Sequence, residues 1–107
     1  MTVTLKDLEA YLQHIYGSWA GEQSLFMKLV EEMGEVAEIL NKRSGRKSYD
    51  GSDLSEELGK ELADIIHYAV AIAAVNGLDL NEIVLEKDRK ASEKYHRDMN
   101  LETFLSQ

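Results

Sequence analysis

The 107-residue chain contains neither cysteine nor proline. The absence of cysteine excludes a disulfide scaffold, a thiolate nucleophile and any zinc or iron–sulfur centre with cysteine ligands, so a metal ion would have to bind oxygen or imidazole ligands. The absence of proline removes the residue that most strongly breaks a helix. With only seven glycines and apolar residues at every third or fourth position, this composition predicts an all-α protein.

Long apolar runs and an excess of positive charge are missing as well. The sequence has no uninterrupted apolar stretch of about 18 residues and no signal peptide at its N-terminus, so we expect a soluble, cytoplasmic protein without a membrane partner. The formal charge of −8 argues against a nucleic-acid partner, because affinity for phosphate backbones depends on Lys and Arg. An acidic protein that binds a nucleotide usually needs a divalent cation held by carboxylates.

The apolar periodicity predicts four main helices in one domain over residues 1–107. The expected helices run from about Thr4 to Tyr16, from Gln23 to Lys42 or Arg43, from Leu54 to Val75 and from Asp79 or Asn81 to Tyr95 or Arg97, with a short turn over Asn100–Phe104. A helical chain of this size is only marginally stable alone. We therefore expect a four-helix bundle that is completed by association into a homodimer or homotetramer.

Two of these helices carry broad apolar surfaces. In the second helix, a stripe of helical period is expected to face the core, and it consists of Leu25, Phe26, Leu29, Val30, Met33, Val36, Ala37 and Leu40. In the third helix, only His67 interrupts the apolar run from Ile65 to Val75. This helix must be surrounded by other helices or by a partner subunit, and we expect its apolar surface to form the subunit contact.

Four acidic residues lie on these same two helices. Glu32 and Glu35 occupy a stripe whose two ends are apolar, and Glu61 and Asp64 share a face that leads into the buried half of the third helix. Each pair has the i, i+3 spacing that puts two side chains next to each other. The short connection between the helices favours an antiparallel arrangement, in which the four carboxylates can converge.

Carboxylates that share a semi-buried site repel one another unless a cation compensates their charge. Because all the ligands would be oxygen atoms, the expected ion is magnesium or manganese rather than zinc or copper. The alternative interpretation is a solvated helix face, since glutamate is a good helix former that usually faces water.

The segment KLVEEMGEVAE over residues 28–38, followed by ELAD over residues 61–64, resembles the EExxE and ExxD signature of the MazG-like nucleoside triphosphate pyrophosphohydrolases. The resemblance implies an all-α enzyme that uses Mg²⁺ to cleave a nucleoside triphosphate between its α and β phosphates. It also implies that the catalytic metal ligands are Glu32, Glu35, Glu61 and Asp64. Glu31 matches the first acid of EExxE, but it points away from the acidic stripe, so we expect it behind the ligands or in solvent.

Several residues are candidates for binding the substrate. Lys28 lies on the acidic stripe, and Lys87 and Tyr95 resemble a Lys and a Tyr of the family. The family often has Asn and Pro where this chain has Ala91 and His96, so the resemblance carries no base or sugar preference. Trp19 can supply a stacking face for a base, although core packing is the alternative interpretation.

A cationic run follows the second helix, and it consists of Lys42, Arg43, Arg46 and Lys47. These side chains either contact phosphate or complement the dipole at the C-terminal end of the helix.

Two other functions are consistent with the sequence. One is a non-enzymatic helical interaction or regulatory module whose acidic residues serve solubility. The other is a di-iron carboxylate bundle, because Asp64-x-x-His67 and Glu93-x-x-His96 resemble the metal-binding elements of such proteins. We expect His67 to be a hydrogen-bonded histidine of a buried helix instead of a ligand.

Overall fold

The computed structural model describes residues 1–19 and 21–107, which form five helices and no strand. The helices are α1 (Leu5–Tyr16), α2 (Glu22–Arg43), α3 (Ser55–Val75), α4 (Leu80–Lys94) and α5 (Leu101–Leu105). The prediction of an all-α fold with four main helices and a short C-terminal turn is therefore confirmed.

The helix ends follow the caps that the sequence provides. Thr4 accepts a hydrogen bond from the backbone N–H of Asp7 at the start of α1. The first turn of α3 uses Asp53, whose carboxylate accepts from the backbone N–H of Ser55 at 2.9 Å. Gly77 has a φ of 65° just after α3, a conformation that glycine adopts more readily than other residues.

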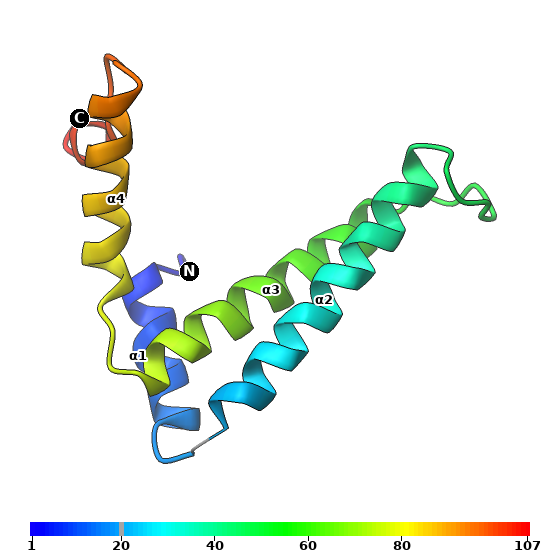
Figure 1. Cartoon of the computed structure of the whole chain (residues 1–107), viewed down its shortest axis with the longest axis horizontal. Helices are drawn as coiled ribbons and strands as arrows, with labels where there is room; N and C mark the ends of the chain where they lie inside the picture. Colours follow the sequence, from blue (N-terminus) through cyan, green and yellow to red (C-terminus); the bar gives the residue numbers. More distant parts are fainter. Residues whose placement is uncertain (20) are drawn as a thin grey trace.

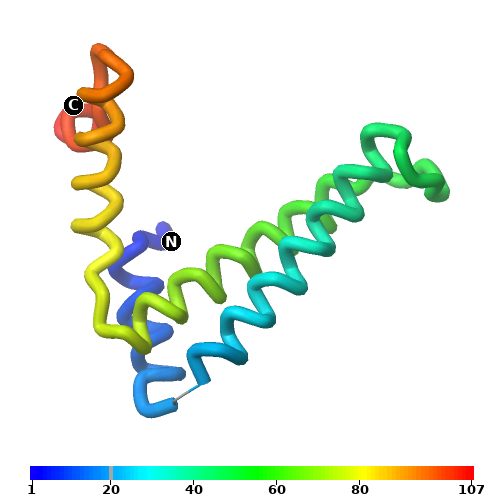
Figure 2. The backbone as a smooth tube through the Cα atoms, viewed as in Figure 1, coloured from blue at the N-terminus to red at the C-terminus, as the bar shows by residue number. Residues whose placement is uncertain are grey.

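Two long helices, α2 and α3, form an antiparallel hairpin that extends from the rest of the molecule (Figure 1). Helix α1 packs against α3, and α4 contacts α1. Figure 2 shows the connection between α2 and α3 at the far tip of the hairpin. The core lies where α1 meets the base of the hairpin, and it consists of Leu12, Leu25, Val70, Ala71 and Ala74.

The predicted apolar stripe of α2 faces the core of this chain only in part: Leu25 is buried in the core, and Leu29 and Val36 are half-buried. Phe26, Val30 and Met33 are exposed, whereas Leu25 and Ile39 are buried. Leu25 is shared with the stripe that carries the acids, and Ile39 belongs to that stripe. Helix α3 packs against this acidic stripe, and much of the broader apolar stripe beside it stays uncovered.

The apolar segment of α3 is buried only in part. Val70 and Ala74 lie in the core, but Ile66 is 53% exposed. Within the described ranges, no single helix is long and apolar enough to cross a membrane. Helices α3 and α4 have that length and apolar character only when they are taken as one segment, and a bend of 108° separates them.

Candidate metal centre

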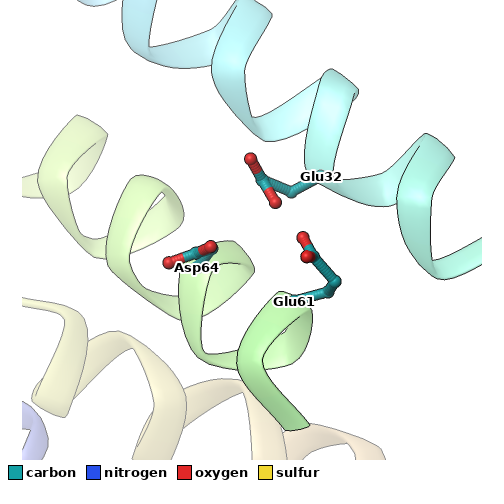
Figure 3. Close-up of side chains that lie close together, drawn as sticks. All are labelled: Glu32, Glu61 and Asp64. Carbon is teal, nitrogen blue, oxygen red and sulfur yellow. The ribbon is translucent and has the colours of Figure 1, made fainter. Parts of the chain in front are cut away.

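Three acidic side chains from the two helices of the hairpin point toward one another (Figure 3). Glu32 projects from the middle of α2, and Glu61 and Asp64 project from the facing turn of α3. Each carboxylate offers one oxygen, and these three oxygens all lie within 4.8 Å of one another. Oxygens at this spacing can bind one hard dication between them with small side-chain adjustments.

The fourth predicted ligand, Glu35, lies one turn further along α2. With Glu61 it lines a hollow of about 240 Å³ between the two helices. Glu31 faces the other way and forms an ion pair with Lys28 at 3.3 Å. The structure therefore places Glu32, Glu61 and Asp64 in one cluster, with Glu35 beside it and Glu31 outside it.

The electrostatics of the cluster centre on Glu61. A proton on Glu61 can be shared with Glu32, and this sharing, the burial of the side chain and the nearby Glu35 raise the pKa of Glu61 to about 7. Its Oε2 atom is out of contact with solvent and has no hydrogen-bond partner among the described residues. An unpartnered buried oxygen within an acidic cluster is suited to bind a cation, so the residues fit the metal ion that the sequence predicts.

Aromatic side chains gather at the α1 end of the cluster. The hydroxyl of Tyr16 and Nε2 of His67 are hydrogen-bonded at 2.9 Å. The ring of His67 lies edge-on to Tyr68, at 5.0 Å between centroids, and Tyr68 follows Asp64 by one turn of α3. Trp19, at 5.8 Å from the Tyr16 ring, is 48% exposed. The predicted hydrogen bond of His67 is confirmed.

The contact of Tyr16 with His67 joins α1 to the site-bearing helix α3, and the sequence did not predict it. The sequence places Tyr16 only at the end of the first helix, because its hydrogen bond to His67 joins residues 51 positions apart. A contact at that separation leaves no local pattern in the sequence.

Lys87 and Tyr95 lie away from the carboxylates in this chain. Both belong to the α4 region, which packs against α1 and α5. The Tyr95 ring is 61% exposed, and the cationic groups of Lys94 and Arg97 lie over it at 5.4 and 5.7 Å. The assignment of Lys87 and Tyr95 to substrate binding stays a prediction.

The cationic run that follows α2 in the sequence lies at the tip of the hairpin, next to the site. The side chains of Lys42 and Lys47 both pair with Glu38. Lys42 also lines the hollow that contains Glu35 and Glu61. A larger hollow, of about 630 Å³, lies between α1 and the turn after α3, and none of the four predicted ligands lines it.

The comparisons with known proteins point to one family. The model of the MazG nucleotide pyrophosphohydrolase domain matches residues 20–98. The uncharacterized protein YpjD of Bacillus subtilis (strain 168) is 27% identical over 82 residues, which cover 73% of this chain and 72% of YpjD. No solved structure matches the chain significantly. The matched range contains all four predicted metal ligands.

Proposed function

Because the chain belongs to the MazG nucleotide pyrophosphohydrolase family, we propose that it hydrolyses a nucleoside triphosphate between the α and β phosphates. The products are the nucleoside monophosphate and pyrophosphate. The substrate is a ribo- or deoxyribonucleotide, and the reaction requires Mg²⁺, for which Mn²⁺ can substitute.

The observation that carries this proposal is the convergence of Glu32, Glu61 and Asp64 within 4.8 Å. A solvated helix face would leave its carboxylates apart, and each would have an ordinary pKa. Here the buried oxygen of Glu61 and the raised pKa of that residue indicate side chains held together for a cation. An interaction module has no need for this arrangement.

The four carboxylates have distinct tasks in the proposed reaction. Glu32, Glu61 and Asp64 would hold the ion, and Glu35, which lines the same hollow as Glu61, would be the fourth ligand. When bound, Mg²⁺ neutralises the phosphates and acidifies an attacking water. A carboxylate oxygen of this cluster that is not bound to the ion would accept the proton of the attacking water.

The surroundings of the cluster suggest where the nucleoside lies. Trp19 presents an exposed ring at the α1 end of the site, and aromatic faces stack on bases of any sequence. Lys28 emerges from the same side of α2 as Glu32 and Glu35, and it pairs with Glu31 at the surface. We place the base toward Trp19 and assign Lys28 to a phosphate or sugar contact.

We propose in addition that the protein is a homodimer or homotetramer. The uncovered apolar stripe of α2 and the exposed Ile66 of α3 support this proposal, because apolar surfaces of this extent usually mark protein contacts.

A panel of nucleoside triphosphates with Mg²⁺ tests the activity. Pyrophosphate release is measured for the wild-type protein and for the Glu35→Gln and Asp64→Asn variants. We expect a loss of at least about a hundredfold in each variant, because each removes a charged ligand or a proton acceptor. Glu56→Gln is the matched control, since Glu56 is an exposed acid of α3 that pairs with Lys60. Activity that survives in both site variants would contradict the assignment.

A further inference from the structure

The fold divides the cationic run at the end of α2 into two pairs. Lys42 and Lys47 turn toward the hairpin, because both ammonium groups pair with the carboxylate of Glu38. Arg43 and Arg46 are exposed, and neither lines the two hollows at the tip of the hairpin. Cations that only complement the dipole of α2 need no such division. The position of the two lysines therefore requires a separate explanation.

The turn after α2 fixes the position of Lys47. Gly45 has a φ of 84°, which glycine adopts more readily than other residues. The backbone N–H groups of Arg46 and Lys47 both donate to the carbonyl oxygen of Asn41, at 2.9 and 3.2 Å. The chain thus leads back toward α2, where Lys47 meets Glu38, nine positions earlier in the sequence. The backbone of the turn, and not the lysine side chain alone, sets this contact.

Two hollows meet at the tip of the hairpin, and the lysines line them in order. The inner hollow, of about 240 Å³, contains Glu35, Glu61 and Lys42. The outer hollow, of about 360 Å³, lies under the loop and contains both Lys42 and Lys47. The residues that line both hollows are Glu38, Lys42 and Glu57. A ligand that extends from the metal centre toward the tip thus reaches Lys42 first and Lys47 second.

Lys42 also lies in line with the carboxylates of α2. Taking 100° per residue, one stripe of that helix carries Lys28, Glu32, Glu35 and Lys42. Lys42 follows Glu35 by two turns, or roughly 11 Å along the helix axis. Its side chain is only 26% exposed, so it lies against the protein and does not extend freely into solvent. An anion held by an ion at the carboxylates can therefore reach this ammonium group.

The outer hollow contains further hydrogen-bond donors. Ser48, Tyr49 and Ser52 line it, and their hydroxyl groups can donate to phosphate oxygens. The loop that carries these residues is anchored by Leu54, which is 5% exposed and lines the same hollow. Two ammonium groups together with several hydroxyl groups are the donors that proteins use to bind phosphate.

We propose that Lys42 and Lys47 bind the β and γ phosphates of the nucleotide, with Lys42 on the inner and Lys47 on the outer phosphate. This inference rests on the proposed function and names the part of the substrate that the tip of the hairpin holds. The nucleotide then lies along α2 with its base toward Trp19 and its last phosphate under the loop. Glu38 holds the two lysines in position before binding. Phosphate carries more negative charge than a carboxylate, so it replaces Glu38 as their partner.

The order of the two lysines makes the protein selective for the number of phosphates. Asp50 and Glu57 also line the outer hollow, so an anion in it is repelled unless both lysines pair with it. A nucleoside diphosphate reaches Lys42 but has no group for Lys47. The triphosphate gains the second contact, and it should therefore bind more tightly than the diphosphate of the same nucleoside.

Calorimetry with inorganic tripolyphosphate and Mg²⁺ tests the two lysines in the absence of a nucleoside. Lys42→Ala and Lys47→Ala should each weaken binding roughly tenfold, and Glu38→Gln should strengthen it by removing the competing anion. Arg46→Ala is the matched control, because it removes the same charge from the same loop outside both hollows. Equal affinities in the variants of Lys42, Lys47 and Arg46 would overturn the proposal, as would a wild-type protein that does not bind tripolyphosphate.

Chemical acetylation of the wild-type protein keeps the proposal testable if Lys42→Ala fails to fold. The extent of acetylation at each lysine is read by mass spectrometry, with and without tripolyphosphate and Mg²⁺. Lys42 and Lys47 should become protected, whereas Lys60, which pairs with Glu56 within α3, should react as before. Equal protection at Lys60 and Lys47 would contradict a specific site.

Steady-state kinetics test the order of the lysines. Lys47→Ala should raise the KM for a nucleoside triphosphate roughly tenfold and leave the inhibition constant of the corresponding diphosphate unchanged, whereas Lys42→Ala should raise both. Equal changes of the two constants in Lys47→Ala would refute this order. Failure of the proposed function is a separate result, namely no pyrophosphate release from any nucleotide by the wild-type protein, and the binding of tripolyphosphate still tests the lysines in that case.

Discussion

Replacing Glu61 by glutamine should make the metal-free protein more stable at pH 8 and at the same time abolish its response to Mg²⁺. The carboxylate of Glu61 lies against Glu32 and Glu35, and this contact raises the pKa of Glu61 to about 7. Above pH 7 the ionised side chain therefore repels its neighbours in the folded state, whereas the glutamine side chain of the variant has no charge. The amide nitrogen of the new side chain can also donate to Glu32.

The dependence on pH follows from the direction of that shift. The folded-state pKa of Glu61 lies above its ordinary value of 4.5, so the proton binds the folded state more tightly than the unfolded state. Its contribution to stability is complete below pH 4.5 and is lost as the pH rises through about 7. The wild-type protein should thus become less stable over this interval in EDTA, and the variant should lack that component of the pH dependence.

The metal reverses this order of stability. An ion present at a hundred times its dissociation constant stabilises the folded state by about 2.7 kcal/mol, which raises the Tm of a small domain by roughly 10 °C or more. Below pH 7 a proton must leave Glu61 before the ion binds, so the affinity for Mg²⁺ should fall about tenfold for each pH unit. Thermal unfolding is followed by circular dichroism with and without Mg²⁺ at pH 5 to 8. It measures the higher stability of the metal-free variant, the pH dependence of the wild type and the rise of Tm with Mg²⁺.

Glu56→Gln controls for the general effect of removing one negative charge, since Glu56 is exposed, pairs with Lys60 and is not one of the three clustered carboxylates. A Glu61→Gln variant whose Tm rises with Mg²⁺ as much as that of the wild type would refute the reasoning. So would a metal-free variant that is less stable than the wild type at pH 8.

Three further changes test the fold around the site, each by urea unfolding followed by circular dichroism. Leu12→Ala should lower the free energy of unfolding by about 2–5 kcal/mol, because Leu12 has no exposed surface; a smaller loss would show that α1 is loosely docked. Tyr16→Phe should cost about 0.5–1.5 kcal/mol through the lost hydrogen bond to His67, and an unchanged stability would argue against that bond in solution. Gly77→Ala should cost about 1–2 kcal/mol, because the φ of 65° is strained for alanine; a stabilised variant would contradict the left-handed conformation.

The helices are predictable from the sequence because their signals are local. Thr4 caps α1, and α3 stops just before Asn76 and Gly77, as the sequence indicates. The convergence of Glu32, Glu61 and Asp64 also follows from spacing, since i, i+3 pairs on two antiparallel neighbours have few other places to point.

The contacts between distant segments are beyond the reach of such signals. The sequence shows that α2 has an apolar stripe and an acidic stripe, but it does not say which of them α3 covers. Periodicity predicts burial of the broader stripe, yet Met33 is exposed and Ile39 is buried. A hairpin that is completed by a second copy can leave its most apolar face uncovered within one chain, and no periodicity distinguishes an intramolecular core from an intermolecular one.

The placement of the acids between two apolar anchors explains how the hairpin withstands their repulsion. Leu25 and Ile39, which are 2% and 6% exposed, fix α2 to its surroundings on either side of Glu32. The repelling carboxylates therefore cannot relax by separating the helices, because separation would expose both anchors to water. The unfavourable charge density is kept in place until a cation binds, so the ion meets ligands that are already gathered and less binding energy is lost to ordering them. The same reasoning locates the region that metal binding rigidifies, which is the middle of the hairpin and not its ends.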